Sequence, residues 1–91
     1  MASGHKSRQV LAQELEAAAR LVSVGQNYTH YKSPDKTYTV LNIAITEADD
    51  RLCVVYRADY ETNLVFVRPL SSWLEKIQHK GKSVDRFKLL T

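Results

Sequence analysis

The sequence predicts an α+β fold that is mostly β. An N-terminal helix precedes a small, strongly bent antiparallel sheet or partly open SH3-like barrel of about four or five strands, with a short helix before the last strand. The hydrophobic period changes from 3.6 to 2 after Gly25, and short apolar runs separated by turn residues then follow one another. With 91 residues, 44% hydrophobic and 25% charged, the chain suits one globular domain.

The first helix is predicted over Ser7–Val24. Leu11, Leu15 and Val22 recur at helical spacing and form a narrow apolar stripe rich in alanine. Ser7 is a suitable N-cap, because its hydroxyl can accept a backbone N–H of the first turn. Gly25 follows as a natural C-terminal stop.

The chain therefore divides into three segments. Residues 1–6 are expected to be a disordered leader or a remnant of expression, 7–24 the helix, and 25–91 a single small β-rich domain. A helix this short is marginal alone in water, so its apolar stripe needs a partner surface. That surface is either the sheet or a second copy of the helix, which makes a homodimer through Leu11, Leu15 and Val22 one hypothesis.

Alternating residues predict the first strands. Gln26–Lys32 is expected to be a short strand, and Ser33–Lys36 a turn with a proline at its second position. Thr37–Thr46 is the clearest strand of the chain. A regular pleat places Leu41, Ile43 and Ile45 on one face and Tyr38, Val40, Asn42 and Ala44 on the other.

Two more strands are expected next. Arg51–Ala58 contains adjacent β-branched valines, and Leu64–Arg68 is ended by Pro69. Polar residues over 47–50 and 60–63 predict the two loops that bound these strands.

The last part of the chain predicts a helix and a strand. A short helix is expected to run from residue 71 or 72 to His79, because Ser72 and Glu75 have the spacing of a capping box. Lys80–Lys82 is then a turn, and Val84–Leu90 the final strand.

The composition excludes several classes of protein. A single cysteine, Cys53, cannot form an intramolecular disulfide and favours a reducing compartment such as the cytoplasm. One cysteine and three scattered histidines offer no zinc-ligand spacing, so neither a metal nor a cofactor is expected. No apolar run is long enough to span a membrane, and the first residues lack the apolar core of a secretory signal.

The charge is unevenly spread. The net charge is +3; residues 47–61 hold five acidic and two basic residues, whereas residues 75–91 hold five basic and two acidic ones. A basic C-terminal end is compatible with a nucleic-acid or phosphate partner. More often, such a run is an ordinary solvated surface.

Aromatic and basic residues gather in a few short clusters, which supply the candidate ligand-binding residues. Arginines in apolar strands can hold a phosphate or carboxylate, aromatic rings beside them can stack a base, and a histidine can donate or accept a proton near neutral pH. The same residues could instead serve the core, or pair with nearby acids as Arg57 could with Asp59, Glu61 or Glu47. The candidates are Tyr28, His30, Tyr31, Tyr56, Arg57, Tyr60, Arg68 and Arg86.

These clusters carry a family resemblance. The sequence resembles the small bacterial family catalogued as domain of unknown function 1653 over about residues 25–89, so the N-terminal helix lies outside the match. The segments that carry it are Tyr28–Lys32, Tyr38–Leu41, Val54–Tyr60, Val67–Leu70 and Gly81–Phe87. Among its departures, Phe66 replaces the family's usual Trp, and Trp73 its usual Phe. Because the activity of that family is unknown, the resemblance implies a fold and a bacterial, cytoplasmic protein rather than a reaction.

The leading hypothesis is a non-enzymatic binding module for an anionic ligand, which is a nucleotide, a nucleic acid or a carboxylate. The density of Tyr, His and Arg motivates it, together with the lack of a paired catalytic motif. One alternative is a small hydrolase or isomerase that uses His30 as its base. The other is a structural or assembly protein that binds a protein partner or dimerises through the N-terminal helix.

Overall fold

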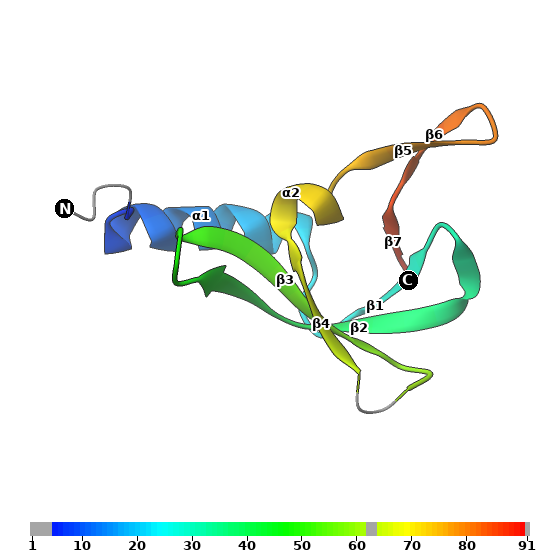
Figure 1. Cartoon of the computed structure of the whole chain (residues 1–91), viewed down its shortest axis with the longest axis horizontal. Coiled ribbons are helices and arrows are strands. Elements are labelled where there is room, and N and C mark those ends of the chain that lie inside the picture. Colours follow the sequence, from blue (N-terminus) through cyan, green and yellow to red (C-terminus); the bar gives the residue numbers. More distant parts are fainter. Residues whose placement is uncertain (1–4, 62–63, 91) are drawn as a thin grey trace.

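The computed structural model describes residues 5–61 and 64–90, which form two helices and seven strands (Figure 1). One sheet has the strand order β4-β3-β2-β1-β7, and β5 and β6 form a separate two-stranded hairpin. The main sheet is open, with β4 and β7 as its edges, which confirms the predicted class and its bent-sheet form. The bounds are α1 Arg8–Leu21, β1 Asn27–His30, β2 Ser33–Thr46, β3 Arg51–Ala58, β4 Val65–Pro69, α2 Leu70–Trp73, β5 Lys76–His79, β6 Lys82–Asp85 and β7 Phe87–Leu89.

The helix α1 begins as expected and ends early. The Ser7 hydroxyl accepts the N–H of Val10 at 3.1 Å, which confirms the N-cap. The helix stops at Leu21 because Val22 takes an extended backbone and is buried in the core. Val22 is therefore not available for contact with a second copy, whereas Leu11 and Leu15 stay half-buried.

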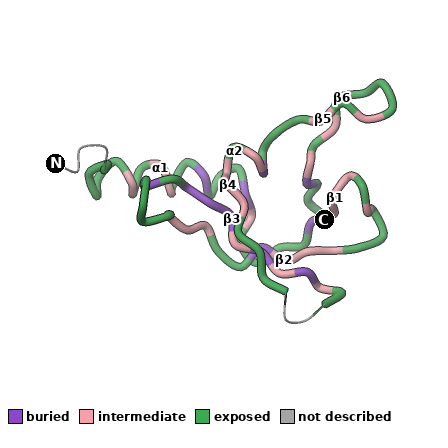
Figure 2. Tube along the Cα trace, viewed as in Figure 1, coloured by how far each residue is buried: buried purple, intermediate pink, exposed green. Residues whose placement is uncertain are grey.

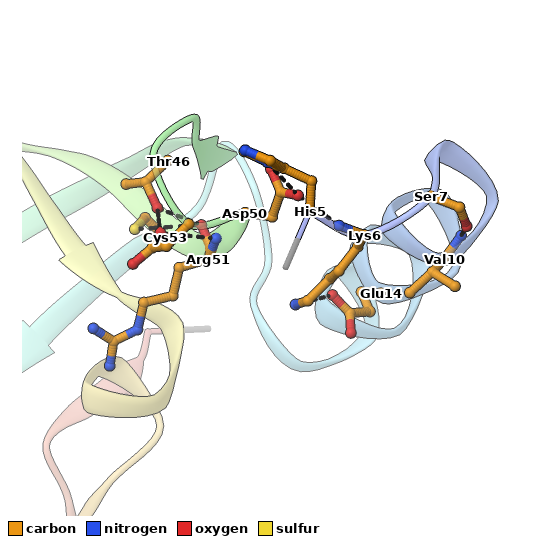
Figure 3. A network of polar contacts seen from close by, with 10 residues as sticks. His5, Lys6, Ser7, Val10, Glu14, Thr46, Asp50, Arg51 and Cys53 are labelled. Atoms are coloured by element: carbon orange, nitrogen blue, oxygen red, sulfur yellow. Dashed lines mark hydrogen bonds and ion pairs between the residues drawn. The ribbon is translucent and has the colours of Figure 1, made fainter. Parts of the chain in front are cut away.

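The chain before α1 contacts the turn between β2 and β3 (Figure 3). The carboxylate of Asp50 accepts the backbone N–H of Lys6 at 2.6 Å and lies 3.0 Å from Nδ1 of His5. The ammonium of Lys6 also pairs with Glu14 at 2.8 Å. Of the residues predicted to form a leader, 1–4 lie outside the described residues, and the other two are held against this turn.

The predicted turn at residues 33–36 is wrong, because β2 already starts at Ser33 and the hairpin turns at Tyr31 and Lys32. Thr29 pairs with Thr37 but His30 pairs with Ser33, so three extra residues of β2 are accommodated there. Proline is tolerated in such an irregular stretch, because it need not donate to the neighbouring strand.

A bulge also changes the predicted faces of β2. Val40 pairs with Tyr56 and Asn42 with Val55, so Leu41 is the extra residue. The inward face therefore switches from even to odd residues: Val40 is buried, while Leu41 is exposed. Ile43 packs against the core on the same side, which a regular alternation would not allow.

The predicted helix over residues 71–79 is mostly wrong. Only the four-residue α2 is helical; its N-cap is Pro69 and the expected capping box does not form. Lys76–His79 is instead strand β5, paired with β6. Lys80 and Gly81 both have positive φ, 53° and 78°, as a two-residue type I′ hairpin turn requires.

The final strand is also divided. The sequence predicts one strand over Val84–Leu90, but Arg86 separates β6 from β7. This break lets β6 stay with the projecting hairpin while β7 joins β1 at the edge of the main sheet (Figure 1). By contrast, β3 has the predicted bounds and the loop before it is confirmed. Part of the loop expected at 60–63 lies outside the described residues.

Figure 2 shows where the chain is buried, and four of the seven residues in the core cluster are aromatic. The rings of Trp73 and Phe87 stack with their centroids 3.8 Å apart, and Tyr28 and Tyr56 meet the Trp73 ring edge-on. The core residues are Val22, Tyr28, Val40, Val54, Tyr56, Trp73 and Phe87. Within residues 5–61 and 64–90, no helix is both long and apolar enough to cross a membrane.

Candidate functional site

A cavity of about 300 Å³ opens beside this aromatic core. Tyr56 of β3 stands opposite Phe66 of β4, and Val54 opposite Arg68. Because side chains alternate along strands, Phe66 and Arg68 share the face of Tyr56. We call this space the aromatic cavity, and its lining residues are His30, Lys32, Ser33, Tyr38, Tyr56, Tyr60, Phe66, Arg68 and Phe87.

Aromatic rings form most of the cavity wall. The Tyr38 ring lies edge-on to those of Tyr56 and Tyr60, with centroids 5.7 and 5.6 Å away, and the Tyr56 and Phe66 centroids are 5.6 Å apart. Burial and a 3.1 Å hydrogen bond with the Tyr60 hydroxyl raise the pKa of Tyr38 to about 12, so Tyr38 stays neutral. Tyr60 is 44% and Phe66 39% exposed, which leaves two ring surfaces accessible to a ligand.

Arg68 supplies one of the positive charges of the cavity. Its Nη1 donates to the Ser72 hydroxyl at 2.8 Å, and its guanidinium carbon lies 5.5 Å from the Phe87 ring centroid. Its Nε is buried and finds no hydrogen-bond partner among the described residues. A buried donor on a cation is costly to leave unpaired, so this atom beside the cavity lacks an acceptor that it needs.

His30 adds a hydrogen-bond donor rather than a base. Burial, followed by the charges of Arg68, Arg86 and Lys32, lowers the pKa of His30 below its ordinary 6.5, so the ring is neutral near pH ~7. The Nδ1 atom accepts the backbone N–H of Lys32 at 3.1 Å. A neutral imidazole whose Nδ1 accepts carries its proton on Nε2, which is then a donor.

The structure brings four of the predicted residues together in this cavity: His30, Tyr56, Tyr60 and Arg68. Tyr31 lies just beyond it, with its ring centroid 4.7 Å from that of His30.

The other three predicted residues lie elsewhere. Tyr28 is buried in the core, where its hydroxyl accepts the N–H of Ser23 at 2.8 Å. Arg57 alternates with Tyr56, so it stands on the opposite face of β3, where it pairs with Asp59 at 3.6 Å. This is one of the ion pairs considered for it from the sequence.

Arg86 holds α2 and the start of β7 together. Its Nε donates to the carbonyl of Ser72 at 3.0 Å, and its Nη2 donates to the Glu75 carboxylate at 2.8 Å. Nε and Nη2 of Arg86 are therefore both bonded within the protein, whereas in Arg68 Nη1 is bonded and Nε is not.

Sequence reasoning missed five lining residues, which are Lys32, Ser33, Tyr38, Phe66 and Phe87. A signal existed for two of them. Phe66 alternates with Arg68, and Tyr38 with the core residue Val40, so period-2 spacing alone would have placed each on the right face. The position of Phe87 depends on the pairing of β7 with β1, and no local sequence pattern predicts that pairing.

In residues 5–61 and 64–90, no three His, Cys, Asp or Glu side chains come together as a metal site. Cys53 is a buried free thiol in β3, and its sulfur lies 3.8 Å from the carbonyl oxygen of Arg51.

Comparisons with known proteins agree with this architecture. The family model described as a protein of unknown function, DUF1653, matches residues 26–89. The crystal structure of a DUF1653 protein from Bordetella bronchiseptica is 28% identical, with a TM-score of 0.63 over 72% of this chain and 85% of the other. A search of the curated proteins gives no match. The family match spans most of the chain and omits α1, as the motifs predict, and the chain therefore belongs to the DUF1653 family.

Proposed function

We propose that the protein is a non-enzymatic binding module that holds an anionic ligand in the aromatic cavity. The observation that carries the proposal is the guanidinium of Arg68, which lines the cavity while its buried Nε has no acceptor among the described residues. A phosphate or carboxylate oxygen would satisfy that donor through a charge-assisted hydrogen bond once the Arg68 side chain turns Nε toward the cavity. The Nε2–H of His30 and the ammonium of Lys32 add to the preference for an anion.

The rings indicate what else the ligand carries. Tyr60 and Phe66 offer partly exposed faces to a planar group, and stacking on such faces tolerates any base. A cavity of about 300 Å³ is at the small end of the range for ligand sites, which fits one ring and one anionic group. A nucleotide would use both halves of the site, whereas a simple carboxylate would use only the Arg68 side.

A catalytic role for His30 is less well supported. A general base must present a nitrogen that can accept a proton from the substrate. In His30 the accepting nitrogen is Nδ1, and it is already bound to the N–H of Lys32. We therefore propose binding rather than turnover, and a cytoplasmic location in keeping with the free thiol of Cys53.

Calorimetric titration with a small panel tests the proposal. The panel is uridine monophosphate, adenosine monophosphate, benzoate and uridine, the last of which has a ring but no anionic group. We expect at least one anion to bind, uridine to bind more weakly, and Arg68→Gln to weaken the bound anion by about tenfold or more. Arg57→Gln removes the same charge on the opposite face of the sheet and should leave binding unchanged. Equal binding by Arg68→Gln, or no binding of any anion, would overturn the proposal.

A further inference from the structure

We propose, on the basis of the function proposed above, that the ligand is a single-stranded nucleic acid that continues from the aromatic cavity past His30 into a second cleft. This cleft measures about 410 Å³ and is lined by residues of the β1–β2 turn, of the β5–β6 hairpin and of β7. We call it the hairpin cleft, and its lining includes His30, Tyr31, His79, Ser83 and Lys88. His30 lines both spaces, so the two sites adjoin.

An unbroken series of rings joins the two sites. Successive centroids are 5.6, 5.5, 5.0, 4.7 and 5.2 Å apart along the series Phe66, Tyr56, Phe87, His30, Tyr31 and His79. The ends of the series, Phe66 and His79, come from β4 and from the projecting hairpin, which lie apart in the fold (Figure 1). Tyr56 and Phe87 are buried and fix the spacing of the series, so the rings that a strand can reach are Phe66 at one end and His30, Tyr31 and His79 at the other. Binding of single strands without strong sequence preference uses such accessible rings, because every base has a face that can stack.

Cations lie beside both sites. Lys36 lies 4.7 Å from the Tyr60 ring centroid and Lys32 5.9 Å from that of Tyr31, while Lys88 lines the hairpin cleft. The carboxylate that lines this cleft, Asp85, is neutralised by an ion pair with Lys76. Each of the two sites therefore presents positive charge to a phosphate backbone.

The arrangement favours a single strand over other anionic partners. A mononucleotide would fill one site and leave the other unused. A duplex keeps its bases stacked inside, so it could not place them in either concave site. An acidic peptide would engage the lysines but would have no planar groups for the rings.

The test measures fluorescence anisotropy with an oligouridylate of about eight nucleotides, a length within the range of small single-strand binding folds. We expect it to bind about tenfold or more tightly than uridine monophosphate binds as a competitor, with affinity falling as salt rises. A deoxythymidylate of the same length distinguishes RNA from DNA, and tighter binding of either strand than of the mononucleotide supports the proposal. His79→Ala should weaken the oligonucleotide about fivefold or more, well beyond its effect on the mononucleotide.

Lys88→Ala should reduce the slope of log affinity against log salt by about 0.7, as expected for one phosphate contact to a single strand. Arg8→Ala removes one charge from the exposed start of α1 and should change neither the affinity nor the slope by this amount. Circular dichroism of each variant confirms that it is folded before binding is compared.

Three results would overturn the proposal. If the mononucleotide binds as tightly as the oligonucleotide, and His79→Ala affects both alike, the hairpin cleft is not used and the anion site of Arg68 stands alone. If a duplex or a polyglutamate peptide binds more tightly than the single strand, the partner belongs to that class instead. If no nucleic acid binds, the inference fails, and benzoate binding that depends on Arg68 then shows whether the proposed anion site survives.

Discussion

The guanidinium carbon of Arg68 lies 5.5 Å from the centroid of the Phe87 ring, which stacks on Trp73 in the core. Arg68 thus connects the edge strand β4 to the aromatic core while its Nε has no acceptor in the part of the chain that the structure describes. The hydrogen bond from its Nη1 to Ser72 holds the side chain in place. This relationship is the basis of the proposed anion site.

Arg68→Met should leave the free energy of unfolding within about 1 kcal/mol of the wild type, or raise it, because it removes an unpaired buried donor. Arg86→Met should lower that free energy by about 2 kcal/mol, because both ends of its guanidinium are hydrogen-bonded within the protein. Urea unfolding measures both. A loss above about 2 kcal/mol for Arg68→Met would instead identify Arg68 as a structural residue.

Trp73→Ala should lower the free energy of unfolding by about 3–5 kcal/mol, because it removes the ring that stacks on Phe87 and contacts Tyr28 and Tyr56. Trp73→Phe should cost much less, since an aromatic ring remains in the same place. Urea unfolding at one pH compares the two variants. Similar losses for Ala and Phe would mean that the stacked geometry contributes little.

Stability should fall as the pH drops from about 7 to 5, because His30 has a lower pKa in the folded than in the unfolded chain. The unfolded state then binds more protons, so acid favours unfolding. The contribution of neutral His30 to the free energy of unfolding is fully present above pH 6.5, the pKa of the unfolded chain. It is lost as the pH falls through the lower pKa of the folded chain. His30→Gln should flatten this part of the pH profile, measured by thermal or urea unfolding. An unchanged slope would contradict the assignment.

Asp59→Asn should lower the free energy of unfolding by about 1–3 kcal/mol near neutral pH. Burial alone would raise the pKa of Asp59, but hydrogen bonds from Thr39, Thr37 and Asn27 and the charge of Arg57 together lower it below its ordinary 3.8. The ionised carboxylate therefore stabilises the fold above pH 3.8, the ordinary pKa of an aspartate. This contribution is lost as the pH falls through the lower pKa of Asp59 in the folded chain. The difference between variant and wild type should shrink in acid; a constant difference would contradict this explanation.

The alternation of apolar residues and the residues typical of turns predicted most of the main sheet. They could not locate its bulges and register shifts. The extra residue at Leu41 reverses the faces of β2, and no local signal distinguishes it from a regular strand residue. Trp73, Leu74 and Ile77 have helical spacing, yet the type I′ turn at Lys80 and Gly81 makes Ile77 part of a hairpin. Here the turn overrides a short hydrophobic pattern.

The sequence predicted the residue types of the site, but only some of the residues that line it. Tyr, His and Arg were the residue types to expect, and Arg68 and His30 do meet in one cavity. In the sequence, Arg57 and Arg86 cannot be distinguished from Arg68, because each is an arginine beside an aromatic or apolar strand residue. In the structure, Arg57 stands on the opposite face of the sheet, and Arg86 is hydrogen-bonded to Ser72 and Glu75. Alternation shows which residues share a face of one strand; which face borders the cavity depends on how distant strands pair.

The side-chain Nε–H signal of Arg68 in a proton–nitrogen NMR spectrum tests the central claim most directly. Titration with uridine monophosphate, and separately with benzoate, should shift this signal and slow its exchange with water, because the anion becomes its acceptor. The Nε–H signal of Arg57, on the opposite face, should stay in place. If the Arg68 signal moves no more than that of Arg57 with either anion, the cavity is not an anion site.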